Sequence, residues 1–278
     1  MSKPFDVFRL LFTPLIVLIG LGAINFKGAA QERLADLLAR SQTAISQNQN
    51  GFRAVQLSGL RRDGFNGVTG ELLKAQPYDL KVLFPDHFIE VETTPFYTAR
   101  TGFAGITPIW IYSPRNGSQL RPTSSVVAGN ERKLRVSRLI LGMFLRLNGP
   151  VTQSAQGVVS RPDRISFDFK GSDGSRSVVD VDPNSMVPVR VRYDSLERFP
   201  RPLSTDERKA GLVPAPSPPE KVESTIDFAR RESTDGVFVP LLIRRVARGV
   251  VFEEIQVETV VIDPPLTRKD FAPSAGQF

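Results

Sequence analysis

Hydrophobic and polar residues alternate with a period of two along much of this chain. The clearest stretch covers residues 223–262, where Ile226 and Phe228 alternate with polar neighbours. Asp235-Gly236 and Arg248-Gly249 divide the stretch into three runs of about equal length. Alternation broken by short turns that contain glycine is typical of an antiparallel meander with one buried face. We therefore expect three consecutive antiparallel strands here.

The chain after this meander has a clear end signal. Pro264-Pro265 follows the last run, and proline ends a ladder because it has no backbone N–H to donate. We expect the remaining segment to dock on the sheet through Leu266 and Phe271. Upstream, the same alternation is present in residues 78–84, 165–169 and 187–193. In all we expect about nine to eleven strands.

Two stretches have a helical period instead. Residues 31–46 place leucines at i, i+3 and i+4, and residues 131–147 carry a wider apolar stripe that includes Leu139 and Met143. Such spacing predicts amphipathic helices, the second of them ended by Asn148-Gly149-Pro150. We expect both helices to pack against the sheet. The same apolar residues would equally well line a cavity under a lid.

The beginning of the chain predicts export. Lys3 and Arg9 precede an apolar run at residues 10–24, and Gly28-Ala29-Ala30 supplies small residues after it. This order is typical of a secretory signal peptide cleaved after Ala30, and the run is short for a membrane span of about 20 residues. An uncleaved anchor in the inner membrane is the alternative. Residues 1–30 are thus a signal peptide or anchor, and the protein is expected in the periplasm.

Residues 31–278 are predicted to form a single domain. The segment 200–219 is rich in proline and charge, yet the strand pattern resumes directly after it, at residue 223. A linker between domains would be followed by a new pattern. We therefore interpret residues 200–219 as a long exposed loop within one domain.

Composition narrows the possible functions. The net charge is +7, but arginines are spread over strands and turns, whereas a nucleic-acid binder concentrates them on one helix or stripe. We expect a solvated sheet face and no nucleic-acid partner; a membrane surface remains compatible with the charge. The chain has no cysteine, which excludes disulfides, thiolate metal sites and a cysteine nucleophile.

No catalytic template is present. The sequence contains no G-x-S-x-G elbow, no P-loop and no dinucleotide-binding glycine motif. The only histidine is His87, which we expect at the surface or in a turn. Glu90 and Glu92 share one strand face and are expected to be exposed charges. The sequence therefore predicts a protein that is not an enzyme and has no cofactor or metal, with a hydrolase based on His87 as the weakest hypothesis.

Several short motifs resemble one known superfamily. Pro85-Asp86-His87-Phe88 is similar to its strand-opening P-D-x-F/Y, and residues 182–188 resemble its D-P-x-T-x-L-P turn. Residues 235–240 and 263–271 resemble its D-G-x-x-x-P and closing N-x-P-L-x-x-x-x-F. Over residues 31–272 the chain thus resembles the outer-membrane lipoprotein carriers of the LolA/LolB/LppX-like superfamily.

The resemblance implies a fold and a class of ligand. The fold is α+β: a curved antiparallel half-barrel sheet with helices covering its concave face, which binds lipid or lipoprotein acyl chains and has no catalytic residues. This chain departs from the pattern in its proline-rich insertion, in Asp263 at the usual asparagine, and in lacking a lipobox cysteine. Without a lipobox cysteine, the chain is not expected to be a lipid-anchored receptor.

Two hypotheses follow for function. In the first, the half-barrel binds a lipid acyl chain or another hydrophobic ligand, for carriage or sensing in the cell envelope. In the second, the domain is a structural or regulatory envelope module that binds a protein partner, such as an inner-membrane protein, through a sheet edge. The first hypothesis places a set of apolar residues at the cavity: Phe84, Phe88, Trp110, Leu139, Met143, Phe144 and Phe167.

Overall fold

The computed structural model describes most of the chain after the N-terminal segment. The described residues are 33–47, 51–66, 69–93, 97–104, 107–114, 126–146, 153–171, 173–212 and 217–271. The predicted signal peptide, or anchor, and the helix-stopping Asn148-Gly149-Pro150 lie outside them. Among the helices of the described part, none has the length and hydropathy needed to cross a bilayer.

The chain forms two units, Met1–Arg40 and Ser41–Phe278. A helix covers residues 33–45, so the boundary falls inside it. This helix coincides with the first helix expected from sequence. All further elements belong to the second unit.

The second unit is built on one 12-stranded antiparallel sheet, one strand more than the expected range. Its strands are β1 (Ala54–Asp63), β2 (Gln76–Leu83), β3 (His87–Thr93), β4 (Tyr97–Ala104), β5 (Thr107–Pro114), β6 (Gln153–Arg161), β7 (Arg164–Gly171), β8 (Arg176–Val181), β9 (Pro188–Glu197), β10 (Glu220–Thr234), β11 (Val237–Ala247) and β12 (Val250–Ile262). The order in space is β5-β4-β3-β2-β1-β12-β11-β10-β9-β8-β7-β6.

This order joins the two ends of the sequence at the middle of the sheet. The first strand, β1, pairs with the last strand, β12, in a register that places Val55 opposite Ile262. Strands β5 and β6, which flank the central helix in sequence, form the two edges. Every other strand neighbour is also a sequence neighbour, so local hairpins build each half and one long-range pairing joins them.

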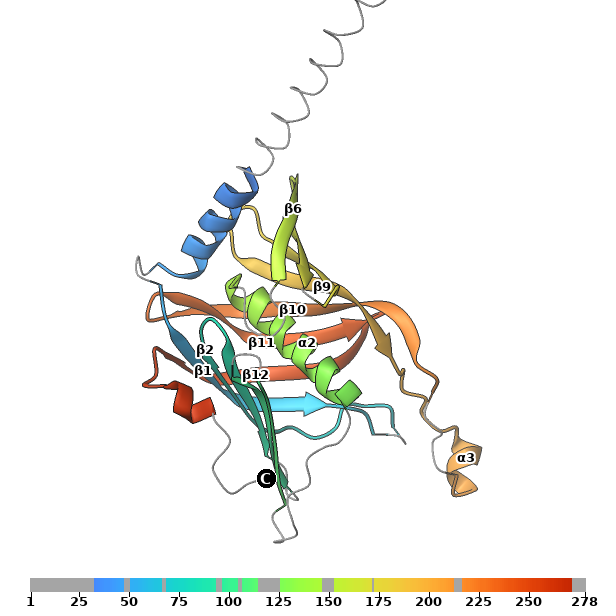
Figure 1. Ribbon diagram of the computed structural model, residues 1–278. Helices are drawn as coiled ribbons and strands as arrows, with labels where there is room; N and C mark the ends of the chain where they lie inside the picture. The colour runs from blue at the N-terminus through green and yellow to red at the C-terminus, as the bar shows by residue number, and fades with distance from the viewer. Residues whose placement is uncertain are drawn as a thin grey trace, which may run out of the picture. The chain divides into compact units, whose positions relative to one another are not determined.

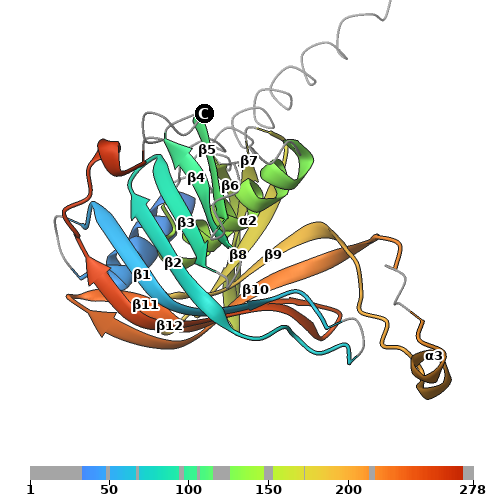
Figure 2. The same ribbon diagram turned by 90° about the horizontal axis from the view of Figure 1, so that it is seen from below.

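The central helix α2 (Val126–Phe144) lies against one face of this sheet and packs on β9 and β10 (Figure 1). Seen from below, the strands curve around it (Figure 2). Its apolar stripe is buried as its period predicts, with Val136 and Ile140 both 0% exposed. Burying each such side chain stabilises the fold by about 1.5–3 kcal/mol. The expected arrangement, a helix on the concave face, is confirmed.

The turns and the tail of the C-terminal meander are also those expected. Asp235 and Gly236 have φ values of 49° and 76°, and Arg248 and Gly249 have 47° and 76°. Two successive residues with positive φ are typical of the type I′ turns that join twisted strands. The tail then docks through Leu266, 9% exposed, and Phe271, 0% exposed.

The proline-rich segment connects β9 to β10 and extends away from the sheet together with the ends of those strands (Figure 2). It contains a short helix, α3 (Thr205–Lys209), which sequence did not predict. A capping box starts the helix: Glu207 N donates to Ser204 Oγ, and Ser204 N donates to the Glu207 carboxylate. None of the α3 side chains is buried, so local capping rather than packing defines this helix.

Candidate ligand-binding site

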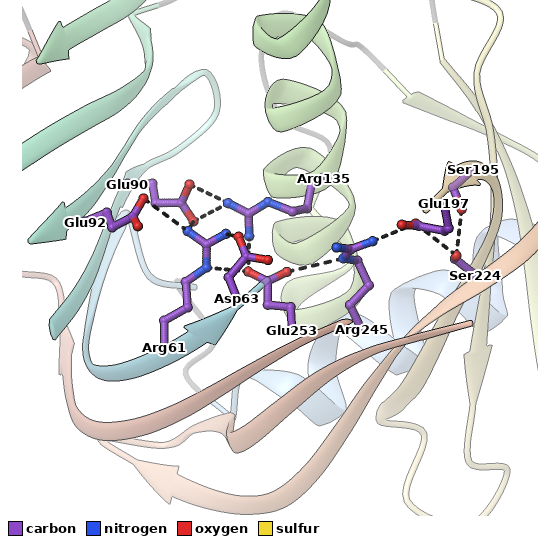
Figure 3. Close-up of polar contacts among 10 residues, drawn as sticks. All are labelled: Arg61, Asp63, Glu90, Glu92, Arg135, Ser195, Glu197, Ser224, Arg245 and Glu253. Carbon is purple, nitrogen blue, oxygen red and sulfur yellow. Dashed lines mark hydrogen bonds and ion pairs between the residues drawn. The ribbon is translucent and has the colours of Figure 1, made fainter. Parts of the chain in front are cut away.

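A network of buried charges connects α2 to the sheet (Figure 3). Arg135 of α2 donates to Glu253 Oε1 of β12 at 2.6 Å and to both carboxylate oxygens of Glu90 on β3. The two glutamates are only 4% and 3% exposed. Because Arg135 is bound on both sides, it fixes the middle of α2 against the middle of the sheet.

The network continues on both sides of Arg135. Arg61 Nε of β1 lies 2.7 Å from Glu253 Oε1, and Arg245 of β11 donates to Glu197 Oε1 of β9 at 2.6 Å. Glu197 then accepts from Ser224 of β10 at 3.3 Å (Figure 3). Because Arg245 Nε also lies 3.7 Å from Glu253 Oε2, a chain of polar contacts crosses the concave face from β3 to β9.

Glu90 and Arg135 hold each other in their charged states. Burial alone would raise the pKa of Glu90, but the positive charges of Arg135 and Arg61 outweigh it and lower that pKa to about 2. Burial likewise opposes the charge of Arg135, yet Glu253 and Glu90 raise its pKa well above the usual value. Burial and the charge of Glu90 raise the pKa of Tyr78. None of these three groups exchanges protons near pH 7, which general acid–base catalysis requires.

The network corrects two expectations from sequence. Glu90 is buried rather than exposed, and Arg245, whose side chain is 17% exposed, belongs to the interior rather than to a solvated face. Arg244 does lie on the solvated face, 48% exposed and paired with Glu254. The sequence could have predicted the burial of Glu90, because Glu90 follows Phe88 by two residues and therefore shares its strand face. A carboxylate on such an apolar face needs a buried partner.

A cavity of about 570 Å³ adjoins the network. It lies between the middle of α2, the end of β1, and the strand ends from which the β9–β10 connection extends. The described residues that line it are Arg61, Asp63, Leu134, Arg135, Arg138, Tyr193, Asp194, Ser195, Leu196, Glu197, Lys221 and Arg245. The lining thus combines apolar side chains with charged groups that are mostly paired.

The residues predicted for the cavity are mostly in the packed core. The exposed fractions are 1% for Phe88, 2% for Leu139, 0% for Met143, 1% for Phe144 and 0% for Phe167. Phe84 is half-buried, and the Trp110 side chain lies outside the part described. None of the described members lines the 570 Å³ cavity. The predicted set therefore stays a prediction.

Two further hollows touch members of this set. A cavity of about 560 Å³ at the C-terminal end of α2 is lined by Phe84, Phe52 and Arg146, among others. The Phe84 ring packs edge-to-face on Phe144, with centroids 5.8 Å apart. Under the middle of α2, Leu139 borders a void of only about 10 Å³, so side chains nearly fill the space between helix and sheet there.

His87 is also not where sequence placed it. It is 7% exposed, contacts the Asp86 carboxylate at 2.6 Å through Nδ1, and packs edge-to-face on Phe271. The docked C-terminal tail thus covers it, which a surface or turn histidine would not show. Within the described ranges, no group of three or more histidine or acidic side chains could hold a metal ion.

Comparisons with known proteins agree with this architecture. No protein-family model matches the sequence, and a search of curated proteins gives no significant match. Among solved structures, the chain is similar to a DUF1329 family protein from Desulfovibrio piger ATCC 29098, with a TM-score of 0.51 and 14% identity over 88% of this chain and 98% of that one. It is also similar to a LolA superfamily protein from Nitrosomonas europaea, with a TM-score of 0.49 and 13% identity over 88% and 97% of the two chains.

At 14% identity, likeness to the DUF1329 family protein shows a shared fold. The predicted fold class, α+β with a curved antiparallel half-barrel sheet and helices covering its concave face, is confirmed: the antiparallel sheet is open, and α2 packs on β9 and β10. The likeness drawn from the turn motifs is thereby confirmed at the level of fold.

Proposed function

We propose that this protein is an exported, non-enzymatic carrier or sensor that binds one lipid-like amphiphile in its half-barrel. The observation that carries the proposal is the cavity of about 570 Å³ beside α2. Its volume lies within the 300–1,000 Å³ that pockets for small ligands usually have.

The lining of the cavity supports an amphiphile rather than a purely apolar ligand. Leu134, Tyr193 and Leu196 offer apolar surface, and Leu196 is left 63% exposed at the rim. Each methylene moved from water onto such a surface contributes about 0.8 kcal/mol. Charged side chains on the same wall would meet the polar end of the molecule. Side chains nearly fill the space between α2 and the sheet, so the acyl tail would lie beside the helix, in the 570 Å³ cavity, rather than under it.

The chemistry of the site supports binding without catalysis. Glu90 and Arg135 are committed to each other and stay ionised at neutral pH, so neither is poised to move a proton. The apolar N-terminal run, interpreted as a signal peptide or anchor, would place the protein in the envelope, where lipids are available.

A second candidate function rests on a separate observation. Strands β5 and β6 form the two edges of the sheet, and Val159 on β6 is 56% exposed. An open edge can pair with an extended segment of a partner protein. This would make the domain a structural or regulatory module of the envelope, as the alternative from sequence proposes.

Native mass spectrometry of protein purified without detergent after export distinguishes the two candidates. We expect a mass excess of lipid size that organic extraction removes. Leu134→Asp should abolish it, because a charge in the cavity wall opposes an acyl chain, whereas the exposed Leu73→Asp should not. Phe144→Asp would be a poor test, since Phe144 is 1% exposed and its loss would unfold the core. A bare polypeptide mass that stays bare with added membrane lipids would favour the edge-binding module.

A further inference from the structure

Among the described residues, one charge in the cavity wall, that of Arg138, has no counter-charge in contact with it. Arg138 of α2 is 8% exposed. Its Nε donates to Ser177 Oγ at 3.3 Å, and its guanidinium lies 4.0 Å from the centroid of the Tyr193 ring. Among the residues that the structure describes, its two Nη atoms have no hydrogen-bond or ion-pair partner, although Arg138 borders the cavity.

The other charged groups of the wall are already paired. Arg135 binds Glu90 and Glu253. The remaining pairs are Asp63 with Arg61 at 2.5 Å, Asp194 with Lys221 at 3.0 Å, and Glu197 with Arg245 at 2.6 Å. The other positive charges of the wall are therefore each neutralised by a carboxylate. An anionic ligand that enters the cavity would find Arg138 as the cation that is still without a counter-ion.

A buried guanidinium without a counter-ion is costly. Burial lowers the pKa of Arg138, while Tyr193, whose ring is in contact with it, and the carboxylates of Asp173 and Asp194 favour its charge. Arginine nevertheless remains protonated in proteins, so the cost stays in the folded state until an anion approaches.

The geometry of Arg138 is suited to an oxyanion. Ser177 holds its Nε and the Tyr193 ring covers one face of its guanidinium, so the plane of the guanidinium is fixed while its two Nη groups stay available as a planar fork. Such a fork binds two oxygens of a phosphate or carboxylate in parallel hydrogen bonds. Burial raises the pKa of Tyr193 to about 12, so its hydroxyl keeps its proton and can donate a further bond.

We propose that Arg138 binds the anionic phosphate or carboxylate group of the amphiphile whose tail lies along Leu134 and Leu196. This assignment rests on the proposed function and adds the class of ligand, an anionic amphiphile. A neutral amphiphile of equal tail length would leave the guanidinium without a partner and would bind less well.

The test is a titration of the delipidated full-length protein with three probes of one tail length: dodecyl phosphate, dodecanoate and dodecanol. We expect the two anionic probes to bind at least tenfold more tightly than dodecanol. Arg138→Gln should remove that preference and leave dodecanol binding unchanged. Arg244→Gln, on the solvated face, makes the same change of charge away from the cavity and should alter nothing. Inorganic phosphate is titrated alone as a fourth probe. Tight binding of inorganic phosphate would indicate a site for a free anion, whereas weak binding would indicate a site for the headgroup of an amphiphile.

A second variant covers the case in which Arg138→Gln does not fold. Arg138→Lys keeps the positive charge but removes the two-nitrogen fork, so it should weaken dodecyl phosphate binding about threefold or more and leave dodecanol binding unchanged. Equal binding of dodecyl phosphate and dodecanol by the wild-type protein would overturn the assignment to Arg138 while leaving the proposed function standing. Binding of inorganic phosphate but of no dodecyl probe, lost in Arg138→Gln, would overturn the amphiphile function. Binding of no probe would overturn both.

Discussion

Glu90 remains ionised in the interior because two arginines hold its carboxylate. Its pKa of about 2 lies below the ordinary value of 4.5, so the folded protein releases this proton more readily than the unfolded chain does. The stability that results is fully present above pH 4.5 and is lost as the pH falls toward 2. A difference of 2.5 pKa units corresponds to about 3 kcal/mol.

Replacing Glu90 by glutamine should therefore destabilise the protein in a pH-dependent way. At pH 7 we expect a loss of about 3–5 kcal/mol, because Arg135 and Arg61 lose a buried counter-charge. The difference from wild type should shrink by about 3 kcal/mol between pH 4.5 and pH 2, as measured by urea unfolding at each pH. Glu254→Gln is the control, since an exposed pair with Arg244 contributes at most about 1 kcal/mol. A loss for Glu90→Gln that is equal at pH 7 and pH 2 would contradict the argument.

Individual site residues were harder to predict than the strands that carry them. A period of two shows which strand face Glu90 occupies but not that Arg135, 45 positions along the chain, lies opposite it. That pairing exists only once α2 has packed across the sheet. Arg138 presented the same difficulty: among the arginines of one helix, only the tertiary structure shows which of them lacks a carboxylate. The residues predicted for the cavity were chosen because they are large and apolar. Large apolar side chains such as Phe88 and Phe167 are also those most often buried in the packed core.

At the scale of elements, sequence predicted more. Asp235-Gly236 and Arg248-Gly249 located their turns because positive φ values restrict the residues that fit. The period also located α2, although its start differs by five residues, Val126 against the expected 131. Sequence gave no sign that β1 pairs with β12, since that contact joins the two ends of the chain. Nor did it predict α3, whose capping box lies within a stretch dominated by proline.

The contact between α2 and the sheet depends on a glycine. A Cβ added at Gly142 would lie 2.4 Å from Val191 Cγ2 and 2.5 Å from the Phe228 ring. Alanine is favoured over glycine inside a helix by about 1 kcal/mol, but overpacking costs about 1–3 kcal/mol. We therefore expect Gly142→Ala to lower the free energy of unfolding in a denaturant titration. Gly157→Ala on the edge strand β6 is the matched control, because a Cβ there meets no atom within 4 Å and should be close to neutral. Stabilisation by Gly142→Ala would mean that α2 lies farther from β9 and β10.

For the whole molecule, the pairing of β1 with β12 determines how the sheet should unfold. The strands β2–β5 and the strands β6–β11 are each built from local hairpins, and each group continues to the centre of the sheet through β1 or β12. The Arg135 network crosses the same centre and ties β3 to β11 through α2. Neither half of the sheet can unfold separately without breaking both the β1–β12 ladder and buried ion pairs. The second unit should therefore unfold in a single cooperative transition.

The only tryptophan makes this expectation measurable. Trp110 belongs to β5, at one edge of the sheet, whereas far-ultraviolet circular dichroism reports on the strands together. If the sheet is one cooperative unit, urea midpoints from fluorescence and from circular dichroism should coincide. A chain of 278 residues often unfolds in steps, so coincidence would be informative. A fluorescence midpoint at lower urea would instead show that the edge formed by β4 and β5 opens first. The concave face would then be reached by that opening rather than from beside α2.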